Sequence, residues 1–130
     1  MWQVDTDYYS VCIAGVDKVK FKRGTLGVDP DDFRKLHPRM IALALYVDHL
    51  AITLFGKQIT ITSMLRDDGI HACGRAVDFS IKNFKQKELD AMKSIIERAF
   101  PYGRGKPTFY QHGEGDNEHI HLQVPWRNEQ

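Results

Sequence analysis

The chain has 130 residues, 42% of them hydrophobic and 27% charged, a composition that is typical of a globular protein and excludes a disordered or low-complexity one. Eighteen basic residues against seventeen acidic ones give a net charge of +1 with no block of like charge, so the basic surface of a nucleic-acid-binding protein is not expected. A chain of this length predicts one domain, residues 1–130, that can bury a core without disulfides.

The sequence shows no sign of secretion or membrane insertion. Residues 1–5 have neither the basic nor the apolar region of a secretory signal, and no segment approaches eighteen apolar residues, so no membrane span is expected. We therefore expect a protein made in the cytoplasm that reaches any extracellular target by another route. Cys12 and Cys73 are too few for a disulfide framework and are expected to be free thiols in a reducing compartment. Cys73 lies two residues from His71, so it is either a small semi-buried residue or an extra metal ligand.

The first half of the chain predicts two helices. They follow an N-terminal segment, residues 1–28, in which one or two short strands are expected, one at Lys18–Phe21, and for which no chemistry is indicated. Asp29 can cap a short helix that ends before Pro38, because a proline disfavours helical geometry in the residue before it. From Met40 to Phe55 the apolar residues recur at intervals of three and four, which predicts an amphipathic helix that Pro38 can open and Gly56 ends.

Two strands are predicted next, at Gln58–Met64 and at Arg75–Ile81, with a loop between them. Apolar residues alternate along the second strand, so Val77 and Phe79 are expected to face the core and Asp78 the opposite side. A carboxylate in the middle of a strand needs a partner, because burying it unpaired is costly.

A third helix is predicted from about Lys85 to Phe100, with Asn83 as its cap and Leu89, Met92, Ile95, Ile96 and Ala99 as its buried stripe. A short strand at Thr108–Gln111 and a glycine-rich acidic turn at residues 112–117 follow.

The last predicted strand, His119–Val124, repeats the arrangement around Asp78. Its apolar residues face the core, while His119, His121 and Gln123 face away. If the two strands are neighbours, Asp78 and His121 can converge on one ion.

His71, Asp78 and His121 together make a three-ligand set for zinc. Two imidazoles and one carboxylate leave one position of a tetrahedral ion open, which is how catalytic zinc is held and how water is activated near neutral pH. Glu118, three residues before His121, is the candidate general base that takes a proton from water and passes it to the leaving amine. Strict alternation would turn Glu118 towards the core, so the strand must begin at or after this residue or bulge there.

Two further residues are candidates for substrate contacts. His119 lies on the metal side and can orient substrate or stabilise an oxyanion, and Arg66 follows its strand closely enough to contact a substrate carboxylate or the tetrahedral intermediate. Each residue also has a simpler interpretation. Arg66 alone is a surface charge, Glu118 alone is an exposed acid, and His112 is a structural residue or a support for the site.

These motifs resemble the zinc D-Ala-D-Ala peptidases, a superfamily that also includes vancomycin-resistance D,D-dipeptidases, phage L-alanyl-D-glutamate endolysins and Hedgehog signalling domains. The resemblance lies in residues 59–80 and 118–124, which contain Arg66 after Ser63, then His71-x-x-Gly74-x-Ala76-x-Asp78, then Glu118-x-x-His121. Residues 1–28 have no counterpart.

The resemblance implies an α+β fold, with helices on one face of a small antiparallel sheet and a zinc cleft on the other. It also implies that His71, Asp78 and His121 bind Zn²⁺, that Glu118 is the catalytic base, that Arg66 contacts substrate or transition state, and that His119 is the first histidine of the paired motif. The segment from Arg66 to His71 is shorter than in many members, which leaves the substrate preference open.

Three functions follow as hypotheses. The first is a monomeric zinc peptidase acting on peptidoglycan stem peptides, either as a D-Ala-D-Ala carboxypeptidase or as an L-Ala-D-Glu or cross-link endopeptidase, which suits a phage or prophage lytic protein that acts on the cell wall once released. The second is a non-catalytic, zinc-dependent binding module of the same fold. The third is a metal-free structural protein. Glu118 and Arg66 favour the enzyme, since a structural site needs neither.

Overall fold

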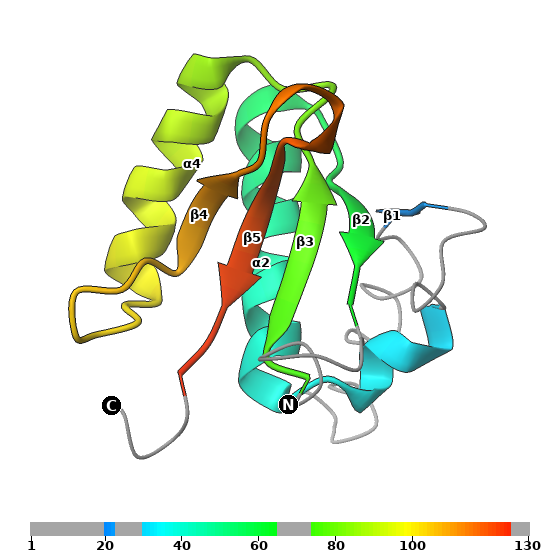
Figure 1. Ribbon diagram of the computed structural model, residues 1–130, viewed down its shortest axis with the longest axis vertical. Helices are drawn as coiled ribbons and strands as arrows, with labels where there is room; N and C mark the ends of the chain where they lie inside the picture. The colour runs from blue at the N-terminus through cyan, green and yellow to red at the C-terminus, as the bar shows by residue number, and fades with distance from the viewer. Residues whose placement is uncertain (1–19, 23–29, 65–73, 126–130) are drawn as a thin grey trace.

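The structure is a computed structural model, and it describes residues 20–22, 30–64 and 74–125. Within these ranges the chain forms a five-stranded sheet with two α-helices packed on one face (Figure 1). The elements in chain order are β1 (Lys20–Phe21), the 3-10 helix η2 (Pro30–Lys35), α2 (Pro38–Phe55), β2 (Thr60–Ser63), β3 (Ala76–Ser80), α4 (Gln86–Ala99), β4 (Phe109–His112), the 3-10 helix η3 (Gly115–Asn117) and β5 (His119–Gln123).

Helix α2 has the bounds that its start and stop signals predict. Pro38 occupies the first helical position, the His37 ring accepts a hydrogen bond from the backbone N–H of Arg39, and Gly56 ends the helix in the left-handed conformation with φ at 68°. By length and composition alone α2 could cross a membrane, a property that the search for a long apolar run did not indicate. In the fold its apolar stripe packs into the core through Met40, Leu43, Ala44, Val47 and Ala51.

The strands are ordered β1-β2-β3-β5-β4, and the sheet is mixed rather than antiparallel. The β2–β3, β3–β5 and β5–β4 pairs are antiparallel as expected, but β1 pairs with β2 in parallel, with Lys20 opposite Thr60. Parallel neighbours need a long crossover, and the chain between these strands supplies one that contains α2. The expectation of an antiparallel sheet was therefore wrong at this edge, whereas the α+β class and the single helical face are confirmed (Figure 1).

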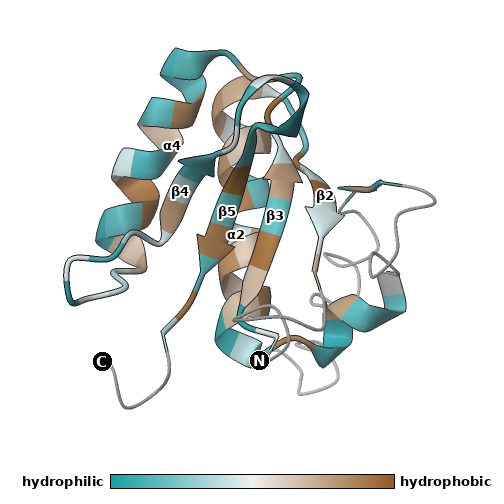
Figure 2. Ribbon diagram, viewed as in Figure 1, coloured by the Kyte–Doolittle hydropathy of each residue, from teal (hydrophilic) through white to brown (hydrophobic). Residues whose placement is uncertain are grey.

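The core lies between the sheet and the two helices. Val77 pairs with Leu122 and Phe79 with Ile120, and all four side chains are fully buried. Along β3 and β5 the ribbon changes between hydrophobic and hydrophilic colours (Figure 2). Because side chains alternate along a strand, this register turns Asp78 and His121 to the face that the helices leave open. The predicted alternation of β3 and β5 is therefore confirmed.

Three local predictions were wrong. Helix α4 is capped at Lys85, not at Asn83, because Glu88 folds back and its Oε1 accepts a hydrogen bond from the Lys85 backbone N–H at 2.9 Å. His112 belongs to β4 rather than to the following turn, because the ladder to β5 extends to the pair His112–His119. Ala99, predicted to be buried, is exposed at the end of α4.

Candidate metal centre and active site

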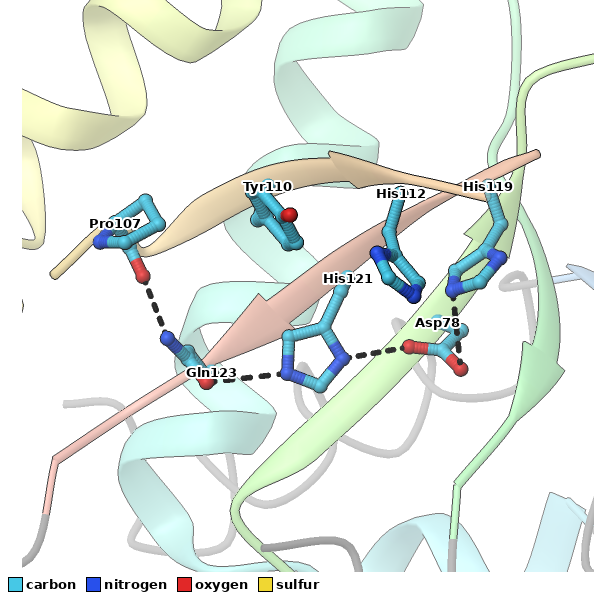
Figure 3. Close-up of a pocket in the computed structure, with 7 residues that line it drawn as sticks. All are labelled: Asp78, Pro107, Tyr110, His112, His119, His121 and Gln123. Atoms are coloured by element: carbon cyan, nitrogen blue, oxygen red, sulfur yellow. Dashed lines mark hydrogen bonds and ion pairs between the residues drawn. The ribbon is translucent and has the colours of Figure 1, made fainter. Parts of the chain in front are cut away.

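The centre of the open sheet face is a carboxylate–imidazole pair. Asp78 and His121 are directly opposite one another on β3 and β5, and His121 Nδ1 lies 2.9 Å from Asp78 Oδ1 (Figure 3). Asp78 is only 5% exposed, so the surrounding protein replaces most of its water. The two strands are neighbours, as the sequence required for these side chains to meet.

Backbone contacts hold the two strands in place around the pair. Gly74, just before β3, has φ at 70°, and its carbonyl accepts a hydrogen bond from the N–H of His37 at 2.8 Å. Val124, just after β5, donates its N–H to the carbonyl of Arg75 at 3.0 Å. Asp78 and His121 are thus fixed by backbone that packs against the start of α2 and by the β3–β5 ladder.

The far side of the His121 ring contacts Gln123. Gln123 Oε1 lies 3.1 Å from His121 Nε2, and Gln123 Nε2 donates to the carbonyl of Pro107 at 2.8 Å (Figure 3). A carbonyl oxygen only accepts, so the Gln123 amide must turn its NH₂ to Pro107 and its oxygen to the ring. His121 Nε2 therefore carries the hydrogen, and in the neutral ring Nδ1 presents a lone pair to Asp78.

His119 is held in the opposite tautomer. Its Nδ1 lies 2.7 Å from the carbonyl of Asn117, which can only accept, so Nδ1 carries the hydrogen. Nε2 of the neutral ring is then unprotonated and lies 3.7 Å from Asp78 Oδ2 (Figure 3). The two imidazoles thus turn lone pairs towards the two oxygens of the same buried carboxylate.

This arrangement suits a cation beside Asp78. Lone pairs of a neutral ring and a carboxylate repel at 2.9 Å, and a positive charge between the two groups removes the repulsion. Two atoms bound to one tetrahedral zinc at about 2.0–2.1 Å lie about 3.3 Å apart, so His121 Nδ1 and Asp78 Oδ1 are within a few tenths of an ångström of the spacing that ligands need. Their donor chemistry fits zinc.

The other predicted residues of the site are only partly described. His71, the third proposed ligand, Arg66, the proposed substrate contact, and Cys73 lie outside the described residues. Within the described ranges no group of three His, Cys, Asp or Glu side chains is placed to hold a metal ion. The described part of the proposed centre is therefore two donor side chains, with His119 beside them.

Glu118 stands at the edge of the pair. Strand β5 begins at His119, but Glu118 has extended backbone and still follows the alternation, so its carboxylate lies on the helical side of the sheet with Gln111, which pairs with Ile120. Its Oε2 accepts a hydrogen bond from Gln111 Nε2 at 2.7 Å, and Gln111 is in turn bonded to Gln86 on α4. The turn before Glu118 needs glycine, because a Cβ on Gly113 would lie 2.4 Å from the carbonyl oxygen of Asn117. Glu118 is thus aimed by neighbouring side chains and a tight turn.

Two cavities on the open face share Asp78 and His119. The first, of about 600 Å³, is lined by Asp78, Pro107, Tyr110, His112, His119, His121 and Gln123. The second, of about 550 Å³, contains Glu118 and also three lysines, Lys20, Lys22 and Lys82. The candidate site therefore has room on both sides of the carboxylate, with the proposed base and the basic residues together on one side.

Several of these residues were not predicted from the sequence. The alternation of β5 placed Gln123 on the metal side but gave it no partner, because the Pro107 carbonyl comes from a loop whose position depends on the fold. Tyr110 and His112 line the first cavity because β4 pairs with β5, and the predicted strand stopped one residue short of His112. The lysines of β1 reach the site only through the parallel pairing with β2.

Comparisons with known proteins add no relative to this description: no family model, no curated protein and no solved structure matches the chain. The likeness to the zinc D-Ala-D-Ala peptidases rests on the motif residues themselves.

Proposed function

We propose that the protein is a zinc-dependent peptidase that hydrolyses peptide bonds of bacterial peptidoglycan. The observation that carries the proposal is the buried Asp78 carboxylate with His121 Nδ1 at 2.9 Å, on a sheet face with a cavity on each side. Side chains at these two positions are what the resemblance to zinc D-Ala-D-Ala peptidases requires. The predicted third ligand, His71, completes the proposed set.

Zinc held by Asp78, His121 and His71 would supply Lewis acidity, polarising a peptide carbonyl and activating water near neutral pH. Glu118 accepts the proton of the attacking water and passes it to the amine of the leaving group. In the structure the Glu118 carboxylate is bonded to Gln111, so the proposed role requires the side chain to turn from Gln111 into the cavity that it lines with Asp78. His119 orients the substrate carbonyl, and Arg66 contacts a substrate carboxylate.

The second cavity suits an acidic peptide. Stem peptides of peptidoglycan carry free carboxylates, and Lys20, Lys22 and Lys82 line the cavity that also contains Glu118. A substrate lying across the sheet would therefore place its carboxylates on the lysine side and its remaining residues beside Tyr110 in the first cavity. The bond that is cut, whether D-Ala-D-Ala, L-Ala-D-Glu or a cross-link, depends on how far the peptide extends in each direction.

A non-catalytic zinc-dependent binding module is the alternative. The presence of Glu118 favours the enzyme, because a carboxylate at the cavity that contains Asp78 is not needed for metal binding alone. Neutralising Glu118 would leave the ligand and zinc binding of a binding module unchanged, whereas a peptidase would lose its general base and its turnover.

The deciding experiment is mass spectrometry of purified peptidoglycan fragments incubated with the zinc-loaded protein, with and without a chelator. New fragments that disappear with chelator identify the bond. The matched control is Glu118→Gln, which keeps an oxygen for the Gln111 hydrogen bond. It should bind zinc as the wild type does and lose turnover by about 10²- to 10⁴-fold, whereas His121→Ala should lose both. An unchanged digest by protein carrying stoichiometric zinc would favour the binding module.

A further inference from the structure

We infer that Gln123 is a positioning residue that commits His121 to bind metal through Nδ1. The inference rests on the zinc site of the proposed function, but not on its peptidase activity. Nothing in the resemblance assigns a role to Gln123, which is known here only by its contacts with His121 and Pro107 (Figure 3).

Gln123 is anchored at both its backbone and its side chain. Its backbone N–H donates to the carbonyl of Thr108 at 3.1 Å, and its side-chain NH₂ donates to the carbonyl of Pro107 at 2.8 Å. Two consecutive carbonyls of one loop therefore determine where the residue lies and which way its amide points. With the NH₂ group occupied, only the amide oxygen can face the His121 ring.

The amide oxygen selects one tautomer of His121. It accepts a hydrogen bond from Nε2–H at 3.1 Å, so the neutral ring carries its only hydrogen on the side away from Asp78. Nδ1 is then the sole nitrogen that can donate a lone pair, and it is the one that lies 2.9 Å from the Asp78 carboxylate. A ring without this partner could rotate or exchange its hydrogen to Nδ1, and both changes remove the donor atom from the site.

Loss of such an outer partner lowers metal affinity by about 10- to 100-fold in known sites. The test compares three variants of the full chain: Gln123→Leu, Gln123→Glu and, as matched control, Gln111→Leu. Gln123→Glu keeps an oxygen that accepts from Nε2–H but loses the donor to the Pro107 carbonyl, so it tests the contact with the ring apart from the anchor. Gln111 is the glutamine on neighbouring β4 that contacts Glu118 instead of His121, so its loss should leave the metal affinity as it is.

Two readouts that do not depend on activity are measured. The first is the Zn²⁺ dissociation constant by competition with a chromophoric chelator. The second is the ¹⁵N chemical shifts of the histidine rings in zinc-loaded protein, which separate a metal-bound nitrogen from a protonated one. We expect the wild type and Gln111→Leu to bind zinc equally with His121 coordinated through Nδ1. Gln123→Leu should bind about 10- to 100-fold more weakly, and Gln123→Glu should recover most of the loss.

Circular dichroism melts of the metal-free variants show whether Gln123→Leu folds, and if it does not, the ¹⁵N shifts of the His121 ring in zinc-loaded wild type still test whether Nδ1 binds the metal while Nε2 carries the hydrogen. Equal zinc affinity in wild type and Gln123→Leu, or coordination of His121 through Nε2, would overturn the inference. A wild-type protein that binds no zinc would overturn it together with the metal site. Failure to cleave peptidoglycan, with the affinity difference intact, would remove only the peptidase.

Discussion

Asp78 is the residue on which the candidate site depends most. It is buried, both of its oxygens face imidazole nitrogens, and the rings are held so that their lone pairs point towards it. If zinc binds there as proposed, the ion stabilises this buried carboxylate, so folding and metal binding should be coupled at this position.

Asp78→Asn tests this coupling. The asparagine NH₂ can donate to the Nδ1 lone pair of His121, so we expect the metal-free variant to be at least as stable as the metal-free wild type. Its zinc affinity should fall by about 100-fold or more, because a charged ligand becomes a neutral one. Thermal melts with chelator and with added zinc measure both effects. A wild-type melting temperature that does not rise with zinc, or a rise that Asp78→Asn retains, would contradict the prediction.

The orientation of the strand residues could be predicted from the sequence, but their hydrogen-bond partners in loops could not. Alternation along a strand has a period of two, so a short pattern was enough to place Asp78 and His121 on one face. The tautomers depend on the carbonyls of Pro107 and Asn117, whose positions follow from the loop and turn rather than from local pattern. The partners of a side chain were therefore predictable within a strand pair and not beyond it.

Among the elements, the junctions of the helices with neighbouring segments contain two carboxylates with opposite pH behaviour. Asp48 on α2 accepts the backbone N–H of Ile59 at 2.9 Å, just before β2. Burial raises the pKa of Asp48 above 3.8, in spite of the Ile59 hydrogen bond and of His49. Glu88 on α4 bonds to Lys57 at 2.7 Å and to the Lys85 N–H, and these contacts lower its pKa below 4.5.

The two shifts predict opposite trends in stability. Folding raises the pKa of Asp48. The contribution of this group to the free energy of unfolding is therefore fully present below pH 3.8 and is lost as the pH rises through the folded pKa. Folding lowers the pKa of Glu88, so its contribution is present above pH 4.5 and is lost as the pH falls through the folded pKa.

Urea unfolding between pH 3 and pH 7 should show this as follows. The free energy of unfolding of Asp48→Asn should increase relative to that of the wild type as the pH rises. The free energy of unfolding of Glu88→Gln should increase relative to that of the wild type as the pH falls. A difference that stays constant with pH for either variant would show that the carboxylate has the same pKa in the folded and unfolded chain.

The junction of Gly74 with the start of α2 can be tested with a control of the same backbone geometry. A Cβ on Gly74 would lie 3.2 Å from the backbone at Leu36 and His37, and φ is 70°, whereas Gly105 has φ at 73° with nothing within 4 Å. Gly105→Ala therefore pays only the left-handed penalty, about 1–2 kcal/mol. Gly74→Ala should cost more, because the packing of β3 against α2 must also shift. If Gly74→Ala and Gly105→Ala lose the same free energy of unfolding, the backbone at Leu36 and His37 moves away from the added Cβ at no cost.

Helix α2 illustrates why some elements were predictable. Pro38, Gly56 and the spacing between them are local signals, and both ends of the helix lie where these signals place them. The cap of α4 was not predictable from Asn83, since Glu88 bonds to Lys85 and is itself held by Lys57 from outside the helix. The parallel pairing of β1 with β2 depends on the whole crossover between them, which no short pattern contains.

For the whole molecule, the division into one helical face and one open face follows from the hydrophobic pattern, and it confines the candidate chemistry to the open face (Figures 1 and 2). The parallel pairing of β1 with β2 then places lysines at the site, which the sequence motifs do not include. It brings Lys20 and Lys22 to the cavity that holds Glu118, with Lys82 from the segment after β3. The cavity also contains Asp78, Asp116 and Glu118, so the fold gathers three lysines and three carboxylates there and the lysines are the groups that can meet an acidic substrate.

If these lysines bind carboxylates of the substrate, reversing their charge should weaken substrate binding without affecting the metal. We expect the double variant Lys20→Glu, Lys22→Glu to raise KM for stem peptides by about five-fold at low salt, equivalent to about 1 kcal/mol. kcat and zinc affinity should stay unchanged, because the described side-chain partners of Asp78 and His121 are His119, Gln123 and one another. The difference in KM should shrink as salt is added, since screening weakens exposed charge pairs.

Arg98→Glu on the last turn of α4 is the matched control, because it also reverses an exposed charge but lies outside both cavities. It should leave KM as in the wild type. Steady-state kinetics on an amidated stem peptide, compared with the free acid, then separates charge recognition from a general effect on the fold. If the double variant discriminates between these two peptides as the wild type does, the acidic groups of the substrate lie elsewhere. The lysine-lined cavity would then have no part in choosing the bond that is cut.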